Sequence, residues 1–87
     1  MKFGYNKRFV KSYARLDKQV QKAIDKALSL LLENFRHPSL RMKKMQGHEG
    51  VFEISANMDI RITFHFEKPD TIVLRNCGHH DRTLNNP

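Results

Sequence analysis

The spacing of the apolar residues changes from a helical to a strand-like period near the middle of the chain, and this change constrains the fold most. Between positions 20 and 32 apolar residues recur about every 3.6 residues, which is typical of one buried helix face. They are Val20, Ile24, Ala27, Leu28, Leu31 and Leu32. Beyond Gly50 apolar and polar residues alternate, as in strands that bury one side. Helices and strands in separate segments indicate an α+β domain.

The first third of the chain predicts a strand and two helices. Lys2–Tyr5 carries aromatic residues at alternate positions and is expected to form an edge strand. Asn6 and Asp17 are each placed to cap a helix, because their side-chain oxygens can accept hydrogen bonds from free first-turn amides. Pro38 lacks an amide hydrogen and ends the second helix. The two helices are expected to form a hairpin with almost no loop.

Three strands are predicted in the second half of the chain. The segments 52–56, 60–66 and 72–77 alternate apolar with polar residues, and turns at 57–59 and 68–70 separate them. Gly78 ends the last strand, and a polar tail follows from His79 to Pro87. We therefore predict a single α+β domain over residues 1–87, with the order β-α-α-β-β-β. It has an N-terminal strand and a two-helix hairpin packed on one face of a twisted antiparallel sheet.

The chain is strongly basic. Its 16 Lys and Arg residues against 9 Asp and Glu give a net charge of +7 at pH 7 with neutral His, which favours a polyanionic partner such as nucleic acid or an acidic protein. The single cysteine, Cys77, excludes an intramolecular disulfide and fits a reducing compartment. No apolar run is long enough to span a membrane, and no signal-peptide core follows Met1. We therefore expect a cytoplasmic protein without a membrane partner.

Strand alternation assigns the polar side chains to the face of the sheet that points away from the helices. This face is expected to carry Glu53, Ser55, Arg61, Thr63, His65, Val73, Arg75 and Cys77. Arg61 follows a turn that contains Asp59, and Arg75 leads into Gly78-His79-His80-Asp81. With Lys43 and Lys44, these side chains are expected to converge on one concave surface. The alternative is the ordinary half-polar outer face of an antiparallel sheet.

The sequence resembles the RelE/ParE toxin superfamily over nearly its whole length. The similarity lies in the order and spacing of several segments. These are Phe9-x-x-x-Tyr13-x-x-Leu16, the long second helix, the stretch from Pro38 to Gly47, the stretch from Asp59 to Phe64, and the stretch from Arg75 to Asp81. The resemblance implies a small basic toxin that cleaves mRNA, usually in the ribosomal A site, and is neutralised by a cognate antitoxin.

The resemblance also implies roles for individual residues. Arg61 matches the arginine that RelE-like members place at the scissile phosphate. His80 lies where YafQ-like members have a catalytic histidine, and Asp59 matches a YafQ-like acidic position. Lys43 or Lys44 lies where YafQ-like members have another histidine, so that match is in position only.

Cleaving RNA without a metal needs a base for the 2′-hydroxyl, an acid for the leaving 5′-oxygen and cations for the charged transition state. Histidine suits proton transfer because its ordinary pKa is about 6.5. The predicted catalytic residues are His80, as acid or base, Asp59, as its opposite number or orienting group, and Arg61. The predicted phosphate- or RNA-binding residues are Arg75, Lys43, Lys44, Arg41 and His79. We predict no metal site and no cofactor. The alternative for 79–81 is an exposed polar tail.

Departures from the family pattern keep three functions open. Glu53 and Ser55 replace the RelE-like lysine pair, and the C-terminal aromatic of both subgroups is absent. The first function is an mRNA endonuclease that acts on the ribosome and inhibits translation. The second is a ParE-like inhibitor of DNA gyrase without nuclease activity. The third is a degenerate member that only binds its antitoxin. The expected partners are a cognate acidic antitoxin and ribosome-bound mRNA.

Overall fold

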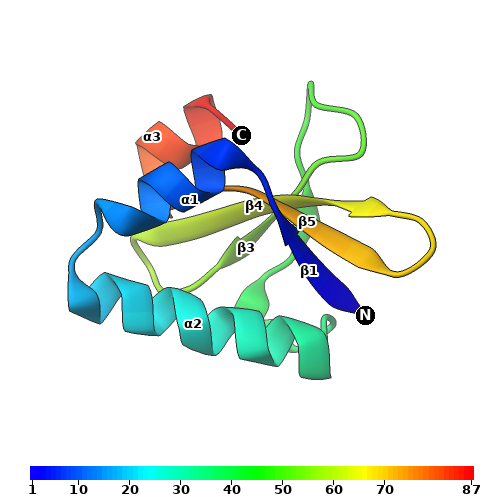
Figure 1. Cartoon of the computed structure of the whole chain (residues 1–87), viewed down its shortest axis with the longest axis horizontal. Coiled ribbons are helices and arrows are strands. Elements are labelled where there is room, and N and C mark those ends of the chain that lie inside the picture. Colours follow the sequence, from blue (N-terminus) through cyan, green and yellow to red (C-terminus); the bar gives the residue numbers. More distant parts are fainter.

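The computed structural model describes all 87 residues as one α+β unit, which confirms the predicted fold class. Its elements are β1 (Lys2–Tyr5), α1 (Lys7–Ala14), α2 (Lys18–Glu33), the short 3-10 helix η1 (Pro38–Leu40), β2 (Lys43–Lys44), β3 (Phe52–Ser55), β4 (Ile60–Glu67), β5 (Thr71–His79) and α3 (His80–Asn85). The five strands form one sheet in the order β1-β5-β4-β3-β2. Figure 1 shows α2 on one side of this sheet and α3 on the other.

The sheet is mixed, whereas the sequence pattern predicted an antiparallel one. The strands β2 to β5 are antiparallel to their neighbours, but β1 pairs with β5 in parallel, from Lys2 opposite Thr71 to Tyr5 opposite Leu74. Short turns force antiparallel pairing, while a long connection leaves the direction free. The helical hairpin and the strands β2 to β4 lie between β1 and β5 in the chain, so no turn sets the relative direction of these two strands. As predicted, β1 is an edge strand.

Both predicted helix caps are present. The Oδ1 atom of Asn6 accepts a hydrogen bond from the Phe9 amide at 2.9 Å, and Oδ1 of Asp17 accepts one from the Val20 amide at 2.9 Å. Such caps satisfy amides that have no partner within the helix. The cap at Asp17 lets α2 begin only four residues after α1 ends.

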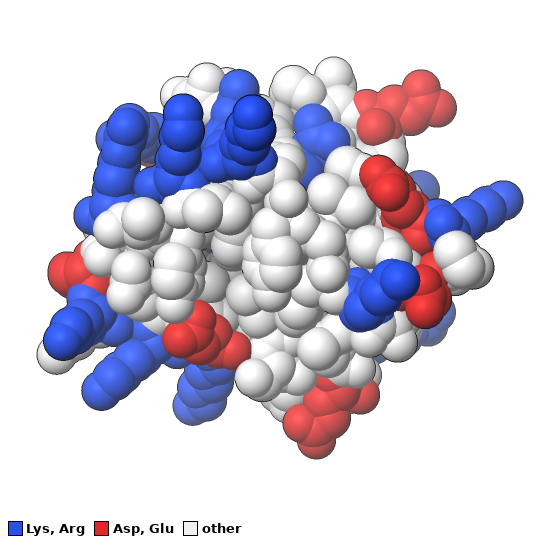
Figure 2. Space-filling view, in the orientation of Figure 1, with Lys and Arg blue, Asp and Glu red and all other residues white.

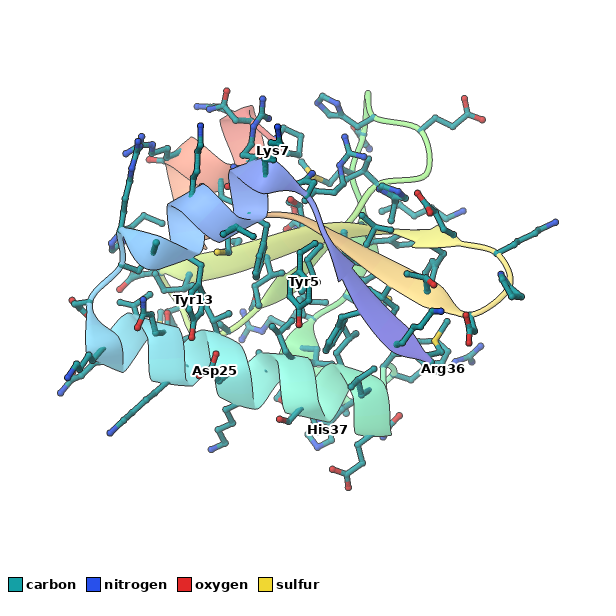
Figure 3. The ribbon with its side chains drawn as sticks, in the orientation of Figure 1. Tyr5, Lys7, Tyr13, Asp25, Arg36 and His37 are labelled. Carbon is teal, nitrogen blue, oxygen red and sulfur yellow. The ribbon has the colours of Figure 1, made fainter.

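A polar clamp holds the two helices of the hairpin together. The hydroxyl of Tyr13 on α1 donates to Oδ1 of Asp25 on α2 at 2.7 Å, and Figure 3 shows the two side chains pointing toward each other. The side-chain amide of Gln21 donates to the Tyr13 carbonyl at 2.9 Å. This hydrogen bond to Asp25, followed by burial, raises the pKa of Tyr13 to about 12. The phenol therefore stays protonated, and the clamp stays closed, throughout the neutral range.

The core lies between α2 and the sheet. The apolar stripe of α2 packs against the inward side chains of β3, β4 and β5, as the two periodicities predicted. The fully buried members are Ile24, Leu31, Leu40, Ile54, Ile60, Ile62, Phe64, Ile72 and Leu74. No helix of the protein is long and apolar enough to cross a membrane.

A β-bulge in β5 overturns the predicted orientation of Cys77. Thr63 pairs with Asn76 and Phe64 with Leu74, so Arg75 is an extra residue on β5. Beyond the bulge the alternation is inverted, since one added residue moves every later side chain to the opposite face. Cys77 therefore lies opposite Ile62 in the core with 3% of its surface exposed, and not on the outer face.

Burial makes Cys77 a packing residue, and this can be tested directly. Desolvation raises the pKa of its thiol to about 12, so the reactive thiolate is suppressed at neutral pH. We expect the native protein to react with a thiol reagent at pH 8 only as fast as it unfolds, whereas protein unfolded in guanidinium chloride should react at once. Absorbance of the released thiol product measures both rates. Rapid labelling of the native protein would contradict the buried position.

The predicted polar tail contains a helix of six residues, α3, which covers part of the outer face of the sheet. Thr83 is buried, and the backbone oxygens of Asn86 and Pro87 accept hydrogen bonds from side chains of the sheet. Gly78 allows the turn from β5 into α3, because its φ of +141° is unfavourable for other residues and a Cβ atom there would lie 3.2 Å from Oγ1 of Thr83. The helices are therefore not confined to one face.

Candidate functional site

An open hollow gathers the three predicted catalytic residues where β4 begins and β5 ends. Arg61 pairs with Gly78 in the sheet, and the His80 amide donates to the Asp59 carbonyl at 2.8 Å. These contacts place the turn before β4 beside the first residues of α3. The hollow has a volume of about 620 Å³. It is lined by Met58, Asp59, Arg61, His79, His80, Asp81 and Arg82.

The imidazole of His80 is held by the next residue in the chain. Its Nδ1 lies 2.9 Å from Oδ1 of Asp81, and the His80 side chain is 50% exposed. A carboxylate at Nδ1 favours the tautomer that carries its proton there. The Nε2 atom has no hydrogen-bond partner within the protein and remains available for proton transfer. The side chain of Asp59 is exposed and makes no hydrogen bond either, so the hollow presents an imidazole and a free carboxylate together.

The guanidinium of Arg61 is anchored on its own turn. Its Nη1 donates to the carbonyl oxygens of Asn57 at 2.8 Å, Met58 at 3.1 Å and Ile60 at 3.2 Å. Its Nε and Nη2 groups donate to no protein atom, so several N–H groups of a fixed cation remain open to a ligand. A planar guanidinium with free donors matches the oxygens of a phosphate.

The structure does not bring Arg75 into this hollow. Its Nε donates to the Pro87 backbone oxygen at 2.9 Å, and its Nη1 lies 2.9 Å from Nδ1 of His65. The other ring nitrogen of His65 lies 3.3 Å from Glu67. Arg75 thus fixes the end of the described chain on the outer face of the sheet, and Arg61 lacks the neighbouring arginine that strand alternation predicted.

The other predicted cations lie outside the hollow. Lys43 and Lys44 are exposed on β2 at the edge of the sheet, and Lys43 lies 3.5 Å from the buried carboxylate of Glu53. Arg41 has a left-handed backbone with φ of 48° and lines a smaller hollow that shares Met58 with the first one. The predicted site residues therefore divide among four places and do not form one concave surface.

Two charged residues of the hollow have no counterpart among the predicted catalytic or binding residues. Asp81, and not Asp59, contacts the ring of His80, and Arg82 brings a second cation to the hollow. The sequence signal that could have revealed them is the run His80-Asp81-Arg82, in which an acidic and a basic residue directly follow a histidine. No group of three or more His, Cys, Asp or Glu side chains is arranged to hold a metal ion.

The arrangement of elements is similar to that of several solved toxins. YafQ from E. coli strain BL21(DE3) is 13% identical, with a TM-score of 0.77 over 92% of this chain and 93% of that chain. The YoeB/ParE toxin from Agrobacterium tumefaciens has a TM-score of 0.76 at 13% identity, over 92% and 99% of the two chains. The chain has the RelE/ParE toxin fold. A chain of the intact E. coli RelBE toxin–antitoxin complex shares this RelE/ParE fold, with a TM-score of 0.69 at 18% identity over 92% and 96%.

A scan of protein-family models and a search of curated proteins found no match to the sequence. The likeness to the RelE/ParE toxins therefore rests on three-dimensional structure. It confirms the arrangement that the resemblance of the sequence implied.

Proposed function

We propose that this protein is the toxin of a type II toxin–antitoxin pair and acts as a metal-independent endoribonuclease on mRNA, inhibiting translation. The observation that carries the proposal is the meeting of Asp59, Arg61 and His80 in one open hollow. Together they supply an acid or base, its opposite number and a cation, which are the groups that RNA cleavage needs. The RelE/ParE fold and the net charge of +7 support the same conclusion.

In the proposed reaction the 2′-hydroxyl of the RNA attacks the adjacent phosphate. One of His80 and Asp59 removes the proton from this hydroxyl, and the other donates a proton to the departing 5′-oxygen. The free N–H groups of Arg61 bind the phosphate oxygens, whose negative charge grows in the transition state. Asp81 is a positioning residue, because it touches only the imidazole of His80.

An antitoxin partner and the ribosome belong to the same proposal. The RelBE and DinJ-YafQ structures are toxin–antitoxin complexes, and we infer that this basic chain is bound and neutralised by an acidic antitoxin. The hollow is open and offers little enclosed surface to hold a substrate. We therefore propose that the mRNA is presented on the ribosome, where its position is already fixed.

Inhibition of DNA gyrase is the second candidate function. The observation that favours it lies in β3. Glu53 and Ser55 stand there in place of the lysine pair of RelE-like toxins, and Glu53 is buried and paired with Lys43. A gyrase inhibitor needs no acid–base pair, so the arrangement of Asp59 and His80 would then have no catalytic purpose.

One experiment separates the two functions. The protein is induced in cells, the 5′ ends of abundant mRNAs are mapped by primer extension, and gyrase–DNA cleavage complexes are measured in the same culture. We expect new 5′ ends within coding regions in minutes, with no rise in cleavage complexes. A translation inhibitor added beforehand, which clears mRNA from ribosomes, should remove most of these ends. Absence of new ends together with accumulating cleavage complexes would replace the nuclease proposal by the gyrase one.

A further inference from the structure

A second surface of the protein is lined by five cations, of which only Arg82 also lines the candidate cleavage site. It is an open hollow of about 430 Å³ between α1 and α3. Eight residues line it: Lys7, Arg8, Lys11, Ser12, Arg15, Asn76, Arg82 and Asn86. None is hydrophobic and none is acidic. Figure 2 shows the corresponding row of Lys and Arg side chains over α1 and α3 at the upper left. We call the five cations Lys7, Arg8, Lys11, Arg15 and Arg82 the α1–α3 basic surface.

Local stability explains only part of these charges: Arg8 donates to the Asn86 carbonyl at 3.2 Å, and Lys11 lies in the last turn of α1, where the helix dipole favours a cation. Lys7, Lys11 and Arg15 recur every four residues, a spacing at which like charges on a helix repel one another. The first turn of α1 holds Lys7 and Arg8 and no acid, although the helix dipole favours negative charge at that end. None of the five cations takes part in a salt bridge. Residues that work against local stability are expected where a function requires them.

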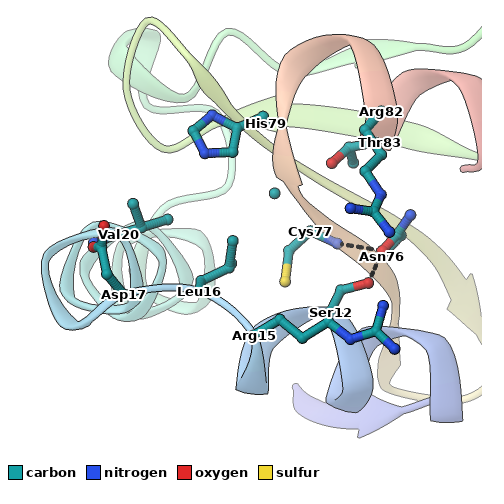
Figure 4. A pocket seen from close by; sticks show the side chains of 11 residues that line it. Ser12, Arg15, Leu16, Asp17, Val20, Asn76, Cys77, His79, Arg82 and Thr83 are labelled. Carbon is teal, nitrogen blue, oxygen red and sulfur yellow. Dashed lines mark hydrogen bonds between the residues drawn. The ribbon is translucent and has the colours of Figure 1, made fainter.

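The α1–α3 basic surface is continuous with the candidate cleavage site. Arg82 lines this hollow and also the hollow of Asp59, Arg61 and His80. A third hollow, of about 360 Å³, shares Arg15 with the hollow between α1 and α3 and His79 with the hollow at His80, and Arg82 lines all three. Figure 4 shows Arg15 from α1 and Arg82 from α3 extending toward the hydrogen-bonded pair of Ser12 and Asn76. Cations therefore follow one path from α1 to His80.

We propose that the α1–α3 basic surface binds the phosphate backbone of the RNA whose neighbouring nucleotides enter the hollow at His80. This inference rests on the proposed nuclease function and extends it with a substrate-binding track. An RNA backbone fits because the hollow offers only cations, hydroxyl and amide groups, which are the usual partners of phosphate. An acidic protein fits less well, because protein interfaces rely on buried aromatic and apolar anchors that are lacking here.

The test compares two variants with the same loss of charge. Lys7→Gln/Lys11→Gln/Arg15→Gln alters the proposed track, and Lys18→Gln/Lys22→Gln/Lys26→Gln removes three exposed cations with the same spacing from α2. Each protein is titrated into a fluorescein-labelled single-stranded RNA with 2′-O-methyl sugars, which cannot be cleaved, and anisotropy is measured at several salt concentrations. Because cleavage is impossible, the result does not depend on nuclease activity. Failure of the proposed nuclease function would appear in the mapping of RNA ends and not here.

We expect the α1 variant to bind this RNA about 10- to 100-fold more weakly at 0.1 M salt, with a salt slope lower by about 2, because each phosphate contact contributes about 0.7 to the slope. The α2 variant should stay within about threefold of wild type, since it loses only general charge attraction. Thermal unfolding of the α1 variant should occur at or above the wild-type temperature, because repulsion along α1 is relieved. Equal losses in both variants would overturn the proposal. So would unchanged RNA binding accompanied by weaker binding of poly-glutamate, which would assign the surface to an acidic protein.

Discussion

Replacing His80 by glutamine is expected to slow RNA cleavage by about 10²- to 10⁴-fold, the usual contribution of one acid–base group. Glutamine keeps the polarity and approximate size of the side chain but cannot gain or lose a proton near neutral pH. The half-exposed ring supports no packing in the core, so the free energy of unfolding should change little. Single-turnover cleavage of ribosome-bound mRNA, with thermal unfolding measured in parallel, gives both quantities.

Two further variants make the His80 result specific. His48→Gln alters an exposed histidine of the loop before β3 and should cleave at the wild-type rate. Asp81→Asn keeps the ring of His80 but removes the charge beside Nδ1, and because Asp81 is 94% exposed and screened by solvent we expect a smaller loss. Wild-type cleavage by His80→Gln would remove this histidine from the mechanism, whatever the other variants do.

The parts of the fold that the sequence predicted correctly depend on local interactions. The caps at Asn6 and Asp17 and the stripe of α2 each follow from a few neighbouring residues. The parallel pairing of β1 depends on contacts between distant segments and leaves no mark in the spacing of residues. Helix α3 offers Leu84 as its only large apolar residue, so it has no apolar stripe to detect.

The candidate site was predicted where two strand ends meet and missed where the register changes. The Asp59 turn and the His80 segment lie at the same end of two adjacent antiparallel strands. Predicting those strands therefore already placed the two segments close together. The bulge at Arg75 adds a residue that period-two counting cannot see, and the predicted position of Cys77 was wrong as a result. The basic residues of α1 were visible in the sequence, but their connection to the site through Arg82 on α3 is seen only in the structure.

Arg61→Ala is expected to lower the cleavage rate by about 10²- to 10³-fold, the usual cost of removing one preorganised donor to a charged transition state. Arg61→Lys should recover part of this loss, because it restores the charge but not the planar fork. The turn itself should persist in both variants. Oδ1 of Asn57 accepts hydrogen bonds from the amides of Asp59 and Ile60, both at 2.9 Å, and these bonds do not involve Arg61.

Asn57→Ala distinguishes the role of the Arg61 cation from the role of the turn that carries it. This variant loses the two side-chain bonds of the turn but keeps the guanidinium and its carbonyl acceptors. If Arg61 acts by binding the scissile phosphate, Asn57→Ala should cleave faster than Arg61→Ala, and raising the salt concentration should slow wild type more than Arg61→Ala. If Arg61 only holds the turn, the two alanine variants should lose the same activity and the same thermal stability. Because Nη1 alone contacts the turn while Nε and Nη2 remain unpaired, the geometry favours the first outcome.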